Sequence, residues 1–199
     1  MATTATPYGL KPVKRMDGMP YAGAVTHYKI NPAGHTGNIF YGQIVYLDSN
    51  GYLTRSDASG ADSTSNNFGG SGIGAVGVFV GCEYINDMGQ TVQGQRYPTG
   101  NTSAATAYVV TDPFVLFQAQ MDGTGAQTVL GINTNINAVQ STTTGSTVTG
   151  VSNSALDADA VATGPFKVVG FASDVGDAYT DVLVKFNPAF HILTDDTTG

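Results

Sequence analysis

The chain of 199 residues lacks tryptophan, has a single cysteine, Cys82, and has only one glutamate, Glu83, among its 15 acidic residues. A lone cysteine excludes an internal disulfide, and the apolar run AVGVFVG before Cys82 predicts a small buried side chain rather than a reactive thiol. Aspartate favours turns and caps whereas glutamate favours helices, so this imbalance, together with 26 glycines, opposes extensive helix. The composition therefore predicts an all-β protein.

Charge of either sign is also scarce. Charged residues make up 12% of the chain, and 8 basic residues leave a net charge of −7. Because phosphate neutralisation needs clustered Lys and Arg, this acidic composition argues against nucleic acid as the main partner. No apolar run approaches the length of a membrane span, and the N-terminus lacks the pattern of a secretory signal. We therefore expect a soluble chain with no membrane partner.

Half of the basic residues lie within the first thirty positions, as Lys11, Lys14, Arg15 and Lys29. Three prolines and three glycines interrupt the first 24 positions, which excludes a long helix and a central strand there. We expect residues 1–24 to form an extended N-terminal arm, packed on its own domain or on a neighbouring subunit. Residues 25–199 are then expected to form one β-rich body.

The segment GQIVYLDSNGYLTR, residues 42–55, predicts a β-hairpin. Asn50-Gly51 favours a type I′ turn, because these residues tolerate positive φ, and the β-branched and aromatic flanks favour strands. The letters DSNG also resemble the start of a calcium-binding loop. That loop needs a glutamate at its twelfth position, which would fall on Ser59, so the turn is the favoured interpretation.

Runs of β-branched and aromatic residues, each bounded by Gly, Pro or Asp, predict further strands at residues 74–85, 107–111, 114–121, 166–172 and 181–186. Residues 124–164 are dense in Asn, Ser and Thr, which predicts a polar excursion outside the core, with one helical turn around residues 154–161. The whole pattern predicts a small β-barrel or β-sandwich body with long polar loops.

The glycine pattern GIGAVG at residues 72–77 matches the fingerprint of a dinucleotide-binding turn. That chemistry needs a strand before the glycines, a helix after them, and an acidic residue about twenty positions later. Here a polar loop precedes, a β-branched run follows, and Tyr97-Pro98 stands in place of the acid. We therefore expect no nicotinamide or flavin cofactor.

Catalytic and metal-binding patterns are weak throughout. The three histidines are scattered, with no second ligand at metal-binding spacing: His27, His35 and His191. Two aspartate pairs fit capping and surface charge: Asp157 with Asp159, and Asp195 with Asp196. Two aspartates acting as acid and base would need a defined cleft, and no pattern selects which two. We expect no enzyme, no cofactor and no metal.

Five segments, taken in order, carry a family resemblance: ATPYGLKPVKRMDGMPYAGAVTHYKI, FYGQIVYLDSNGYLTR, GIGAVGVFVGCEY, VVTDPFVLFQAQMDG and VLVKFNPAFH. Together they resemble small structural proteins of tailed-bacteriophage heads, and in particular capsid decoration, or cement, proteins. The resemblance extends over most of the chain. It consists of short β motifs and a proline-punctuated arm, with no active site among them.

The resemblance implies an all-β body on the outer surface of the virion capsid, commonly a homotrimer at threefold positions, that staples neighbouring subunits of the major capsid protein. The implied partners are the major capsid protein and other copies of this chain, after synthesis in the host cytoplasm. The resemblance brings no catalytic residues. From exposure and charge, the arm residues expected to contact the capsid are Pro7, Tyr8, Leu10, Lys11, Val13, Lys14 and Arg15.

A virion adhesin or carbohydrate-binding module would use the same β architecture. It would stack exposed aromatic rings on sugars, with Tyr84, Tyr97 and Tyr108 as candidates. This alternative predicts that the isolated protein binds a host glycan, whereas decoration predicts that it binds the capsid. A depolymerase would need a pocket with converging carboxylates, and the sequence nominates none.

Overall fold

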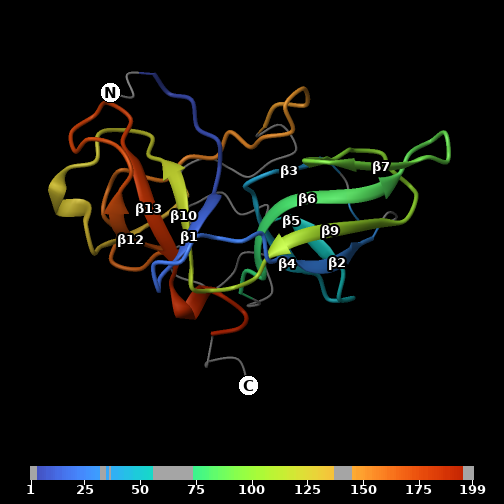
Figure 1. Cartoon of the computed structure of the whole chain (residues 1–199), viewed down its shortest axis with the longest axis horizontal. Coiled ribbons are helices and arrows are strands. Elements are labelled where there is room, and N and C mark those ends of the chain that lie inside the picture. The colour runs from blue at the N-terminus through green and yellow to red at the C-terminus, as the bar shows by residue number, and fades with distance from the viewer. Residues whose placement is uncertain (1–3, 32–34, 36, 56–73, 137–144, 195–199) are drawn as a thin grey trace.

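The computed structural model describes residues 4–31, 35, 37–55, 74–136 and 145–194. Within these ranges the fold is all-β, as predicted, and the only helices are two 3-10 turns, η1 (Gln127–Val129) and η2 (Pro188–Phe190). The strands form two large sheets that lie side by side (Figure 1), and two further short strands pair as a small ribbon.

One large sheet closes on itself as a five-stranded barrel. Its strands in chain order are β2 (Thr26–Ile30), β4 (Ile44–Leu47), β5 (Leu53–Arg55), β6 (Gly77–Ile85) and β9 (Ala105–Val110). The barrel order is β4-β5-β2-β9-β6, and β4 also pairs with β6, which closes the ring. Strand β7 (Thr91–Gly94) extends the sheet outward from β6. The barrel confirms the expected architecture.

The second large sheet has the order β1-β10-β13-β12-β11. Its strands are β1 (Lys11–Arg15), β10 (Val115–Gln120), β11 (Asn133–Thr134), β12 (Phe166–Phe171) and β13 (Asp181–Phe186). Every pairing in this sheet is antiparallel. The small ribbon pairs β3 (Ile39–Phe40) with β8 (Arg96–Tyr97).

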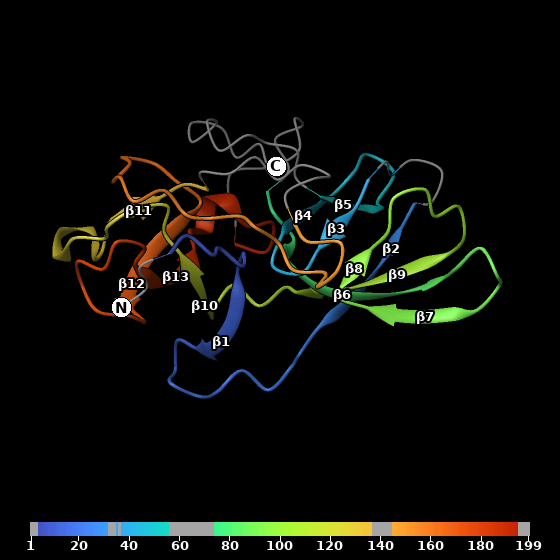
Figure 2. The same cartoon turned by 90° about the horizontal axis from the view of Figure 1, so that it is seen from above.

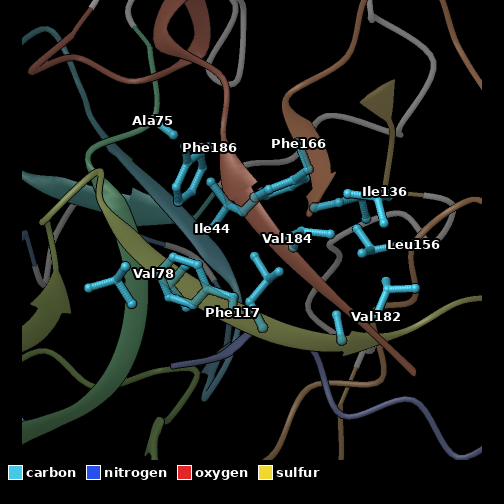
Figure 3. Close-up of a cluster of buried hydrophobic side chains, with 14 of the residues drawn as sticks. Ile44, Ala75, Val78, Phe117, Ile136, Leu156, Phe166, Val182, Val184 and Phe186 are labelled. Carbon is cyan, nitrogen blue, oxygen red and sulfur yellow. The ribbon is translucent and has the colours of Figure 1, made fainter. Parts of the chain in front are cut away.

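A shared hydrophobic core joins the two large sheets. Ile44 and Val78 of the barrel face Phe117 and Phe186 of the second sheet, and all four side chains are at most 3% exposed (Figure 3). The rings of Phe117 and Phe186 meet edge-on, with centroids 5.8 Å apart. Full burial of one such side chain contributes about 1.5–3 kcal/mol relative to exposure. Barrel and sheet therefore bury residues against each other in one shared core. A second cluster fills the barrel itself.

The β4–β5 hairpin is confirmed, but its turn is not type I′. Gly51 has φ +77°, whereas none of the described non-glycine residues, Asn50 included, has positive φ. Asp48 organises the turn instead: its Oδ1 accepts hydrogen bonds from the backbone N–H of Asn50 (2.8 Å) and of Tyr52 (2.9 Å). The aspartate side chain thus stabilises a three-residue loop that ends in a left-handed glycine.

The prediction that residues 124–164 lie outside the core is wrong for the described part of this segment. Val129, Ile136 and Leu156 are at most 6% exposed and belong to the shared core. The helical turn predicted around residues 154–161 is also wrong, because the Leu156 N–H and the Gln120 carbonyl form a 2.9 Å bond that holds the chain extended beside β10. Sparse apolar residues in a polar sequence fill the core here because long-range pairing, not local composition, places them.

Candidate functional site

The segment expected to contact a capsid lies along the edge of the second sheet. Strand β1 pairs antiparallel with β10, with Lys11 opposite Gln118 and Arg15 opposite Val115. Pro12 lies within β1, which suits an edge strand because proline cannot donate a ladder hydrogen bond. The segment is therefore extended and packed on its own chain. The predicted boundary between an arm and a body at residue 24 stays a prediction.

The start of this segment is fixed to the body by Leu10. Its side chain is only 2% exposed and belongs to the shared core. Its N–H donates to the Gly42 carbonyl at 2.9 Å, and the N–H of Gly9 donates to the Ser154 carbonyl at 3.1 Å. Leu10 was expected at the capsid contact on grounds of exposure. That assignment is wrong, because an apolar residue next to a paired strand is drawn into the core.

Beyond β1 the chain turns back and covers part of the strand's free edge. The N–H of Arg15 donates to the Met19 carbonyl at 2.8 Å, and the N–H of Tyr21 donates to the Val13 carbonyl at 3.1 Å. Residues 16–25 then run along the outside of the molecule to β2 (Figure 2). Together β1 and this return form a well-anchored projection on one face.

The exposed side chains of this projection, together with the neighbouring Phe114, form what we call the contact surface, defined as Lys11, Val13, Arg15, Met16, Met19 and Phe114. Its apolar members are unusually exposed, at 49% for Met16, 61% for Met19 and 56% for Phe114. Phe114 joins the group because its carbonyl accepts the N–H of Met16 at 2.9 Å. Flexible Met side chains beside an aromatic ring suit binding to a protein surface.

The charges of the contact surface differ in their pairing. Arg15 Nε lies 3.3 Å from Asp112 Oδ2 and 3.8 Å from Asp17 Oδ2, so two carboxylates balance its charge. Among the described residues no ion pair joins Lys11 to an acid. Lys11 therefore carries an ammonium without an ion pair at one end of β1, whereas the exposed Met and Phe side chains lie at the Arg15 end.

The other residues expected at the contact are less accessible. Pro7, Tyr8 and Lys14 are half-buried. Burial, and then the negative charge of Asp181, raise the pKa of the Tyr8 phenol, so it stays protonated. Of the predicted residues, Lys11, Val13 and Arg15 are exposed, whereas the other four are half-buried or buried. The bulge between Pro12 and Lys14 places Lys11 opposite Gln118 and Arg15 opposite Val115, so these two residues lie on opposite faces of the sheet. In the sequence, Met16 and Met19 stand out as apolar residues of a proline-rich arm, whereas nothing in the sequence links Phe114 to them.

The histidines occupy unrelated places. The exposed His27 ring lies 4.9 Å from the Tyr108 ring on the barrel surface, and His35 Nδ1 lies 3.0 Å from Thr54 Oγ1. His191 is fully buried, and burial lowers its pKa to about 4. No group of three or more His, Cys, Asp or Glu side chains could hold a metal ion in the part of the chain that the structure describes.

Cys82 is buried and forms no disulfide, as predicted. Burial raises the pKa of its thiol to about 12, an effect that the nearby Arg96 only partly offsets, so the thiol is unreactive near neutral pH. Of the glycine pattern at 72–77, residues 72 and 73 lie outside the described chain. Gly77 opens strand β6 rather than a helix, which removes the helix N-terminus that a pyrophosphate would require.

The aspartate pairs are accounted for only in part. The N–H of Asp159 donates to Asp157 Oδ1 at 2.8 Å, an ordinary local turn contact, and residues 195 and 196 lie outside the described chain.

Comparisons with protein-family models, with curated proteins and with solved structures find no match. None of the helices described is long and apolar enough to cross a membrane.

Proposed function

We propose that this chain is a capsid decoration, or cement, protein of a tailed bacteriophage, located on the outer surface of the virion. In this role it binds major capsid protein subunits, staples neighbours together and catalyses no reaction. The observation that carries the proposal is the contact surface: an exposed Met-Met-Phe patch with an unbalanced lysine, held on a strand that is bonded to the body. The resemblance of the sequence to such proteins supports the same role.

The physical fit lies in rigidity combined with exposure. Because Leu10 and the β1–β10 ladder order the segment in the free protein, binding does not incur the full entropy cost of ordering a flexible arm. Large apolar side chains exposed at 49–61% gain free energy when a partner covers them. We propose further that the chain acts as a homotrimer, since three such surfaces on one particle combine modest affinities into lasting attachment.

The test uses substitutions rather than removal of residues 1–21, because that deletion would also remove Leu10 from the core. Purified phage shells that lack decoration are mixed with the full chain and sedimented. We expect the triple variant Met16→Ser, Met19→Ser, Phe114→Ser to lose most of its attachment. The matched control replaces three exposed apolar residues elsewhere, Met88→Ser, Val148→Ser and Leu193→Ser, which are 84%, 93% and 62% exposed.

The control variant is expected to attach as well as the unchanged protein does. Equal attachment by the contact-surface variant would show that this surface does not bind shells, and failure of the unchanged protein to attach at all would reject decoration. Analytical ultracentrifugation tests the trimer separately. A monomer both in solution and on the particle would contradict it.

A further inference from the structure

The barrel carries a row of polar side chains that its strand register places side by side. Lys29 of β2 lies opposite Thr106 of β9, Thr106 lies opposite Glu83 of β6, and Glu83 lies opposite Gln93 of β7. These four residues come from four separate strands. The row includes Glu83, the one glutamate of the chain, and Gln93 Nε2 donates to its Oε2 at 3.0 Å.

This row points away from the barrel interior. Along each strand the neighbouring residues line the inside, among them Ile30, Cys82, Ala105 and Ala107, all at most 7% exposed. Side chains alternate between the two faces of a strand, so the intervening row faces solvent. Lys29 and Gln93 are accordingly exposed and Thr106 and Glu83 are half-buried.

The two charges in the row are held apart. Adjacent strands are about 4.8 Å apart, so the backbones of Lys29 and Glu83, separated by β9, lie about 10 Å from each other. Within the described chain no ion pair joins them. The row therefore presents three hydrogen-bonding groups in one line. The Lys29 ammonium donates, the Thr106 hydroxyl both donates and accepts, and the Glu83 carboxylate accepts.

A cleft of about 390 Å³ opens at the same place, which is within the size range of small-ligand sites. Its lining residues include Lys29, Glu83 and Thr106 from the row and the half-buried Tyr52. Tyr84 also lines it, but this residue follows Glu83, so its ring points toward the barrel core and packs there. The Tyr84 ring is held edge-on against the buried Tyr97 ring, with centroids 6.3 Å apart. The cleft thus combines the polar residues of the row with one tyrosine, Tyr52.

We infer that this cleft binds an uncharged saccharide. Sugar hydroxyls both donate and accept, so one sugar unit satisfies the carboxylate and the ammonium together, while the Tyr52 ring covers a C–H face. The charges of Lys29 and Glu83 cancel, which removes any preference for an anion. A phosphate backbone would meet a carboxylate and only one lysine, and an apolar peptide would bury both charges without partners.

This assignment changes the aromatic set expected for a carbohydrate site. Tyr97 is 1% exposed, so its ring supports Tyr84 and cannot stack on a ligand. Tyr108 lies on the neighbouring outward row, against His27, and Tyr52 takes the position at the cleft. The cleft belongs to the barrel, whereas the contact surface belongs to the other large sheet, so the two sites are independent of each other (Figure 1).

The test is binding of the full-length chain to immobilised oligosaccharides. The probes are neutral oligosaccharides of hexose and N-acetylhexosamine units, with uronate-containing and sialylated ones for comparison. We expect saturable binding to neutral members. Glu83→Gln, Lys29→Met and Tyr52→Ala should each weaken it about tenfold or more, because each removes a polar or stacking partner.

Matched controls on other surfaces are Asp174→Asn, Lys167→Met and Tyr179→Ala, which should bind as the unchanged protein does. Circular dichroism and thermal unfolding of every variant establish that it is folded. The inference is overturned if the unchanged protein binds no neutral saccharide, if it prefers the charged probes, or if the three cleft variants bind as tightly as the controls. Loss of shell attachment with no loss of glycan binding in these variants would also overturn it.

Discussion

Gly9 and Gly42 pack backbone against backbone at the base of the contact surface. A Cβ atom on Gly9 would lie 2.7 Å from the Gly42 carbonyl oxygen, and both residues have positive φ, +72° and +86°. This close approach allows the Leu10 N–H to reach the Gly42 carbonyl and directs the Leu10 side chain into the core. The orientation of β1 therefore depends on two glycines far apart in sequence.

Replacing Gly9 by alanine should destabilise the fold by about 1–3 kcal/mol or more, because the left-handed backbone and the carbonyl clash act together. Gly18→Ala is the matched control: its φ is +87°, but no atom lies within 4 Å of its Cβ position. Urea unfolding of the two variants separates backbone strain from steric conflict. Equal destabilisation would show that the Gly9–Gly42 contact contributes nothing specific.

The buried His191 predicts a loss of stability in mild acid. Burial lowers its pKa to about 4 from the ordinary 6.5, so below about pH 6.5 the unfolded chain binds a proton that the folded chain does not. Stability from this residue is complete above pH 6.5 and falls as the pH drops toward 4, by about 1–3 kcal/mol. Unfolding of the native chain and of His191→Gln across this range should show a steeper slope in the native chain. Parallel slopes would assign the acid sensitivity to other groups.

Salt should distinguish the two outward cations of the contact surface. Arg15 is balanced by Asp112 and Asp17, whereas Lys11 has no ion pair among the described residues. We expect Lys11→Ala to weaken attachment to shells more at low salt than at high salt, because ions screen exposed charges. Arg15→Ala should show a smaller salt dependence. Sedimentation at a series of salt concentrations measures both, and the reverse order would contradict this charge assignment.

The Asp48 side chain predicts a local effect on the β4–β5 turn. Asp48→Ala removes the acceptor of two backbone N–H groups and should cost about 1–2 kcal/mol of stability. Ser49→Ala, in the same loop, is the control and should change little. Chemical denaturation of both variants is the measurement. If Asp48→Ala is as stable as the unchanged protein, water replaces the carboxylate without loss of stability.

Much of the fold could be predicted from local sequence because β-branched runs bounded by Gly, Pro or Asp mark strands whatever their partners. The strands at residues 166–171 and 181–186 follow this rule. The sequence does not predict strand β2, THYKI, because its polar outward residues hide the alternation of apolar and polar side chains. The same holds for strand β7, Thr91–Gly94. In both, pairing with neighbours supplies what the local sequence lacks.

The candidate sites were less predictable because they depend on register between distant strands. The N-terminal basic and apolar residues could be identified from sequence, but the burial of Leu10 and the exposure of Phe114 could not. Leu10 is buried, and Phe114 is exposed beside Met16. Lys29 and Glu83 are 54 positions apart, and only the β2–β9–β6 pairing aligns them.

The proposed decoration of a capsid is tested most simply by the position of this chain in an intact particle, determined by electron cryomicroscopy. We expect density for the barrel and its companion sheet on the outer face of the shell, with the side chains of Met16, Met19 and Phe114 against major capsid subunits. Density in the tail or fibres, or on the shell with that surface facing solvent, would contradict it.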